Sequence, residues 1–104
     1  MDTAILEQLK SVFSALSGEI QLLYDESKND KQAELVELLR EVATANPKIQ
    51  VVASSEKSEI PRFRIHARGK PTGVIFKGIP GGHEFSSLVL GILNADGKGK
   101  LPDT

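Results

Sequence analysis

The sequence predicts an α/β domain with a mixed four-stranded sheet and helices on both faces of that sheet. Two observations lead to this class. A strand, a helix and a second strand fit into about 35 residues between Glu19 and Ala53, which is typical of a parallel βαβ unit with a right-handed crossover. After them, two strands separated by the short Gly/Pro loop 68–71 predict an antiparallel hairpin, and a helix follows.

The first half of the chain supplies a leading helix and the start of the βαβ unit. Residues 3–16 are predicted to be helical because their apolar residues recur at helical spacing: Ile5, Leu9, Val12, Phe13 and Leu16. Glu19–Tyr24 is an apolar run of the length of a buried strand. Asn29 and Gln32 resemble a capping box, which would open a second helix that runs to about residue 45.

The second half contains three strands and a closing helix. Ile49–Ala53 is rich in β-branched residues and is predicted to be a strand, followed by a polar loop at Ser54–Glu59. Arg62–Ala67 and Thr72–Lys77 form the hairpin. In Gly78–Leu93 a Gly/Pro turn cluster precedes a helix whose apolar stripe consists of Phe85, Leu88, Val89, Ile92 and Leu93.

The resulting order, α-β-α-β-β-β-α, is that of the thioredoxin-like fold with one additional N-terminal helix. A ferredoxin-like split βαβ fold would need another strand after Leu93, and no strand pattern follows it. We expect residues 1–98 to form one domain and residues 99–104 to be a C-terminal tail or linker, because the composition from Asn94 onward is that of a linker.

The totals exclude several classes of function. The net charge of −1 provides no global field for binding nucleic acid or an anionic membrane. The sequence has no Cys, so disulfides, thiolate metal sites and cysteine nucleophiles are excluded. No signal peptide pattern and no apolar run of spanning length are present, and we expect a cytoplasmic protein without membrane contact.

Other sites receive little support from the residues. The two histidines, His66 and His83, are too few for a zinc site, and we expect no metal and no cofactor on this chain. No nucleophile elbow surrounds Ser86 or Ser87. The glycines before the last helix match no nucleotide-binding pattern, and Glu84 would repel phosphate.

Two surfaces could bind a partner. Arg62, Arg64, His66, Arg68 and Lys70 share one parity, so a basic strand Arg62–Lys70 could bind an acidic protein or, less favoured by the charge and the scarcity of aromatics, nucleic acid. The second surface is a face of the last helix formed by Glu84, Ser87 and Gly91, where two small residues would let another element approach closely. That face could also support a homodimer.

The run Gly82–Leu93 (GHEFSSLVLGIL), together with a strand that starts after Pro61, resembles the N-terminal domain of the flavoprotein subunit of alkyl hydroperoxide reductase. That domain fuses two thioredoxin-like subdomains, of which the first lacks redox cysteines and the second carries a Cys-x-x-Cys dithiol. The chain resembles the first of them. The resemblance allows either an excised fragment of an NAD(P)H-dependent peroxide-reducing flavoenzyme or a stand-alone relative.

The resemblance implies roles for individual residues. Pro61 would be the cis-proline of the fold, and Ser27, Lys28, Asn29 and Asp30 would occupy the position of the missing dithiol. Serine oxygen cannot take part in disulfide exchange, so this domain would be redox-inactive.

The resemblance also implies where the dithiol domain would dock. Glu84 would face the neighbouring dithiol as a possible acid/base helper, with His83, Phe85, Ser87 and Gly91 shaping the docking surface. The implied function is a non-catalytic domain that supports a dithiol-bearing domain in peroxide-reducing electron transfer.

Overall fold

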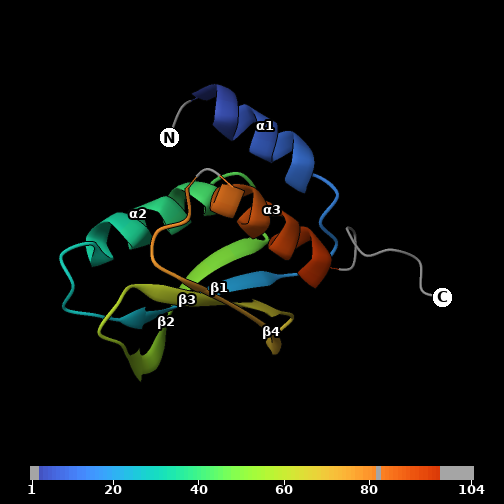
Figure 1. Cartoon of the computed structure of the whole chain (residues 1–104). Helices are drawn as coiled ribbons and strands as arrows, with labels where there is room; N and C mark the ends of the chain where they lie inside the picture. The colour runs from blue at the N-terminus through green and yellow to red at the C-terminus, as the bar shows by residue number, and fades with distance from the viewer. Residues whose placement is uncertain (1–2, 82, 97–104) are drawn as a thin grey trace.

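The computed structural model of the chain describes residues 3–81 and 83–96. Its elements follow the predicted order (Figure 1). The helices are α1 (Thr3–Phe13), α2 (Gln32–Ala43) and α3 (His83–Ala95). The strands are β1 (Ile20–Glu26), β2 (Ile49–Lys57), β3 (Arg62–Ala67) and β4 (Lys70–Lys77). The predicted tail, residues 99–104, lies outside the described residues.

The four strands form one mixed sheet in the order β2-β1-β3-β4. β1 and β2 are parallel, as expected for two strands joined through α2, and Leu23 lies opposite Val52. β1 and β3 are antiparallel, as are β3 and β4. The predicted βαβ unit and hairpin are therefore both confirmed.

All three helices lie on the same side of the sheet (Figure 1), so the expectation of helices on both faces is wrong in this detail. α2 packs against β2 and β1, α3 packs against β3, and α1 packs on α2. Burial alternates along β3 because the helices cover only one face of the sheet. Phe63 and Ile65 are completely buried under the helices, whereas Arg62 and Arg64 on the opposite face are partly exposed. The sheet's second face carries no helix within the described residues.

The core lies between the sheet and the helices. Buried side chains from the three helices, the α1–β1 connection and strands β1, β2 and β3 form a single cluster. Burial of this apolar surface, at about 25 cal/mol per Å², is the main stabilising contribution. Its members are Leu9, Phe13, Leu16, Ile20, Leu22, Leu35, Leu39, Val42, Ile49, Phe63, Ile65, Leu88 and Ile92.

The hairpin between β3 and β4 is tighter than the predicted loop 68–71. Ala67 pairs with Lys70, which leaves Arg68 and Gly69 as the two turn residues. Both have positive φ, 54° and 80°, as a type I′ turn requires. This turn matches the twist of the flanking strands, so β4 begins earlier than expected.

Three local expectations are wrong. The capping box does not form: Asn29 caps the turn before α2 by accepting from the backbone N–H of Lys31 at 2.9 Å, while the Gln32 amide donates to the Asp25 carbonyl. Ser54–Lys57 continues β2 instead of forming a loop. The described residues contain no cis peptide bond, so Pro61 is trans; it stands just before β3, where its missing N–H costs no sheet hydrogen bond.

Candidate functional site

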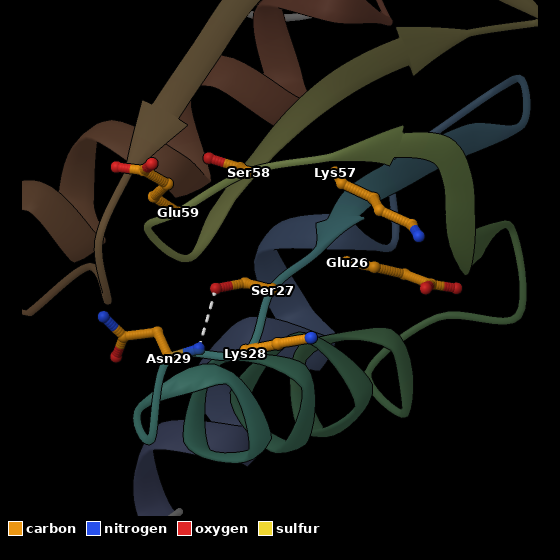
Figure 2. A pocket seen from close by; sticks show the side chains of 7 residues that line it. All are labelled: Glu26, Ser27, Lys28, Asn29, Lys57, Ser58 and Glu59. Atoms are coloured by element: carbon orange, nitrogen blue, oxygen red, sulfur yellow. Dashed lines mark hydrogen bonds between the residues drawn. The ribbon is translucent and has the colours of Figure 1, made fainter.

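The segment that the sequence assigns to a missing dithiol lies in an open depression. It joins the end of β1 to α2, at the carboxyl edge of the parallel pair, which is the usual place for a site in an α/β sheet. The depression has a volume of about 620 Å³ (Figure 2). Its lining residues come from the end of β1, the loop that follows it, the end of β2 and the β2–β3 connection: Glu26, Ser27, Lys28, Asn29, Lys57, Ser58 and Glu59.

Ser27 has a structural contact in this depression. Its hydroxyl oxygen accepts a hydrogen bond from the backbone N–H of Asn29 at 3.0 Å, which tightens the turn into α2 (Figure 2). The depression therefore offers hydroxyls, lysines and carboxylates but no thiol. Among residues 3–81 and 83–96 no cluster of three metal-binding side chains occurs.

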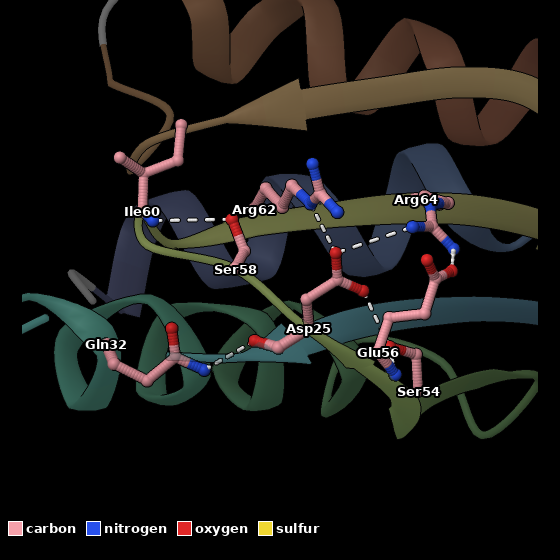
Figure 3. Close-up of polar contacts among 8 residues, drawn as sticks. All are labelled: Asp25, Gln32, Ser54, Glu56, Ser58, Ile60, Arg62 and Arg64. Atoms are coloured by element: carbon pink, nitrogen blue, oxygen red, sulfur yellow. Dashed lines mark hydrogen bonds and ion pairs between the residues drawn. The ribbon is translucent and has the colours of Figure 1, made fainter. Parts of the chain in front are cut away.

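Asp25 is the functional-looking residue that the sequence reasoning missed. It is fully buried near the end of β1, directly before the depression. Its Oδ1 accepts from the Ser54 hydroxyl at 2.6 Å, and its Oδ2 accepts from Arg62 Nε and, at 3.4 Å, from Arg64 (Figure 3). The signal in the sequence that could have identified it is a carboxylate directly after the apolar run of a buried strand.

The pKa of Asp25 follows from these contacts. Burial alone would raise the pKa, because the charged form loses solvation. The hydrogen bonds from Ser54 and Arg62 and the positive charges of Arg64 and Arg62 outweigh burial and hold the pKa of Asp25 below its ordinary value. Asp25 is therefore a fixed anion at neutral pH and not a proton carrier.

The same contacts show that the arginines of the predicted basic strand are already ion-paired. Arg62 and Arg64 do share a face, as predicted, but Arg62 pairs with Asp25, and Arg64 pairs with both Asp25 and Glu56, the latter at 2.7 Å. The Arg64–Glu56 hydrogen bond raises the pKa of Arg64. The charges of these two arginines are thus largely balanced within the domain.

Arg68 does not continue that basic surface, because it lies in the type I′ turn. Its guanidinium donates to Oδ1 of Asp96 at 3.2 Å and to the Ser17 hydroxyl at 3.2 Å. Asp96, just past α3, also accepts from the backbone N–H groups of Ser17 and Gly18, each at 2.9 Å. Asp96 thereby joins the end of α3 to the α1–β1 connection.

The pKa of Asp96 is shifted in the same way as that of Asp25. Burial would raise the pKa, but the backbone hydrogen bonds from Ser17 and Gly18, the Ser17 hydroxyl and the charge of Arg68 together lower it. Asp96 therefore holds this junction as an anion.

The residues of the predicted docking surface on α3 do not all face solvent. Glu84 and Ser87 are exposed, and Phe85 is half-buried against the core. The side chain of His83 lies outside the described residues. Gly91 faces the sheet: a Cβ placed there would lie 3.0 Å from Cδ1 of Ile65. The close approach that the small residue permits is therefore with this chain's own β3, and Gly91 does not belong to the docking surface.

The chain is similar to several known proteins, although no family model matches it. It is 37% identical over 98 residues to the F subunit of alkyl hydroperoxide reductase (AhpF) from Staphylococcus aureus strain MRSA252, covering 94% of this chain and 19% of the relative. The corresponding protein of Staphylococcus epidermidis is 36% identical over the same length. The chain thus spans about a fifth of these relatives.

Solved structures show the same relation. The N-terminal domain of the alkyl hydroperoxide reductase AhpF from Enterococcus faecalis superposes with a TM-score of 0.88 and 26% identity, over 100% of this chain and 56% of that one. A C503A mutant of AhpF from Enterococcus faecalis gives a TM-score of 0.87 and 28% identity. The thioredoxin-like fold is thereby confirmed. The chain is related to the N-terminal domain of the alkyl hydroperoxide reductase flavoprotein AhpF, as one of its subdomains or as a relative of one.

Proposed function

We propose that this chain is a non-catalytic thioredoxin-like domain that docks with a dithiol-bearing thioredoxin-like domain and supports it in peroxide-reducing electron transfer. The observation that carries the proposal is the match to the Enterococcus faecalis N-terminal domain, in which this chain accounts for 56% of the length. The remainder of that domain is the natural candidate for the dithiol partner.

The chemistry of the chain supports a supporting role. Disulfide exchange needs sulfur on both sides, and the sequence contains no Cys. Asp25, the buried carboxylate nearest to the dithiol position, is held as an anion by Arg62 and Arg64 and is not available for proton transfer. Electrons would therefore pass through a flavin and through dithiols that belong to other domains.

The exposed first turn of α3 is the proposed docking position. Glu84 is exposed there, and Phe85 lies beside it. Glu84 would act on the partner's thiols only in the complex, where it would come within hydrogen-bonding reach of them. The alternative of a basic adaptor through Arg62–Lys70 is not favoured, because Asp25, Glu56 and Asp96 pair with its arginines.

A domain exchange tests the proposal. The 98 matched residues of AhpF from Staphylococcus aureus are deleted, or replaced by this chain, and peroxide reduction driven by a nicotinamide cofactor is measured with the partner peroxiredoxin. We expect the deletion to lose most of the activity and the replacement to restore it to within about tenfold, a cost of about 1.4 kcal/mol. A replacement that folds, by circular dichroism, but is as inactive as the deletion would refute the proposal.

The role of Glu84 is tested in the same chimera. Glu84→Gln should lower the rate and alter its pH profile, whereas Glu37→Gln, a change at another exposed glutamate on α2, should leave both unchanged. Equal rates and profiles for the two variants would remove Glu84 from the proposal while leaving docking intact.

A further inference from the structure

The two edge strands of the sheet differ in how they are protected from pairing with another strand. β4 carries Pro71, Gly73 with a φ of +87°, and a lysine at each end, Lys70 and Lys77. Proline, irregular backbone and lysine are the usual means of blocking an edge. Residues 49–53 of β2 (IQVVA) run in regular register beside β1 and contain no proline, no glycine and no charge; the register with β1 shifts only after Ala53. One edge is therefore blocked and the other is open.

The outward backbone groups of β2 follow from its pairing with β1. The carbonyl of Lys48 accepts from the N–H of Ile20 at 2.9 Å, so it points toward β1. Because backbone direction alternates along a strand, Gln50 and Val52 also point toward β1, while Val51 and Ala53 point outward. No strand in the described part of the chain lies on that outer side.

We propose that the outer edge of β2 pairs with β2 of a second copy of this chain, antiparallel, around a two-fold axis at Val52. Val51 of one copy then lies opposite Ala53 of the other, and the two exchange backbone hydrogen bonds. Val52, 39% exposed in the single chain, packs against its own copy. The two sheets become one continuous sheet. This pairing does not depend on the proposed function.

A second copy fits this edge because the strand is self-complementary. A row of outward N–H and C=O groups is a template on which another extended strand can form a continuous set of backbone hydrogen bonds. In this alignment the neutral residues Val51, Val52 and Ala53 of one copy meet those of the other, so no like charges face each other. With a net charge of −1, two copies do not repel strongly.

The oligomeric state of the full chain tests the proposal. Sedimentation equilibrium between about 10 μM and 1 mM should show a monomer–dimer equilibrium, the range in which a short strand interface is expected to act. Val52→Lys places two ammonium groups together at the axis and should weaken the dimer by at least tenfold. Ile75→Lys is the matched control: Ile75 is 44% exposed, lies on the same sheet face and belongs to the blocked edge β4, so dimerisation should be unchanged.

A second variant acts on the backbone alone. Ala53→Pro removes an outward N–H and leaves the β1 side intact, so it should weaken the dimer while circular dichroism and thermal unfolding of the monomer remain close to those of the unsubstituted chain. A chain that is monomeric at 1 mM would overturn the proposal. So would a dimer that Val52→Lys and Ala53→Pro leave unchanged, because the interface would then lie elsewhere.

Discussion

Replacing Asp25 with Asn should destabilise the domain strongly, although Asn has nearly the same size. Asp25 is fully buried and accepts hydrogen bonds from Ser54, Arg62 and Arg64. The substitution removes the one buried negative charge between two guanidinium groups. Those groups then face each other across a neutral amide, with only Glu56 left to balance Arg64.

The loss of stability depends on how deeply Asp25 and its two arginine partners are buried. Removing one partner of a buried ion pair typically costs about 3–5 kcal/mol. Arg62 and Arg64 keep 27% of their side-chain surface exposed and can regain some solvation, which lowers the cost. We expect a decrease in the free energy of unfolding of about 2–4 kcal/mol, or a fall in Tm of roughly 8–30 °C for a domain of this size.

Urea unfolding at a series of pH values measures this effect. The pKa of Asp25 is lower in the folded state, so its contribution to stability is fully present above the unfolded pKa of about 3.9 and is lost as the pH falls through the folded value. The gap between the unsubstituted chain and Asp25→Asn should therefore be constant from about pH 5 to 8 and narrow progressively below about pH 4.

The exposed residue Asp30, in the loop that follows, provides the control. Asp30→Asn should change stability by less than about 0.5 kcal/mol at every pH. If Asp25→Asn also lies within about 0.5 kcal/mol of the unsubstituted chain at pH 7, or if the gap does not narrow at all as the pH falls below about 4, the electrostatic account of Asp25 is wrong.

Three further substitutions test other parts of the structure. Asp96→Asn should lower the free energy of unfolding at pH 7 by about 1–3 kcal/mol, because the backbone N–H of Ser17 loses its anionic acceptor. In the same urea series, this difference should disappear as the pH falls through the lowered pKa of Asp96. Gly91→Leu should lower the free energy of unfolding by about 1–3 kcal/mol or more, because the new side chain would overpack against Ile65. Thermal unfolding measures this loss, and an unchanged Tm would indicate that Gly91 serves only in partner docking. Gly69→Ala should cost about 1 kcal/mol because φ is +80° there, and an unchanged Tm would contradict the assigned turn.

Local patterns were sufficient for the order of the elements. The helical spacing of Leu9 and Phe13 and the β-branched run at Ile49 reflect burial of one face, which is a short-range property of the chain. The strand Arg62–Ala67 was predicted with its observed bounds, since alternating Phe63 and Ile65 face the helices. The end of β2 was not predictable in this way, because its polar residues Ser54 and Glu56 are held by long-range contacts to Asp25 and Arg64.

In the candidate site, too, some features follow from the sequence and others only from long-range contacts. The absence of sulfur from residues 27–30 is a matter of composition, and it excludes disulfide exchange without any structure. The partners of the basic residues depend on the fold: only the pairing of β1 with β3 brings Asp25 to Arg62, and only the α1–β1 connection brings Ser17 to Asp96.

The sequence by itself determined the fold class, the element order and the lack of thiol chemistry, because these follow from periodicity and residue type. The tertiary structure alone decided which charges are already paired, which direction Gly91 faces and which sheet edge is open. Each of these depends on contacts between residues that are distant in the sequence, and local sequence patterns do not predict such contacts.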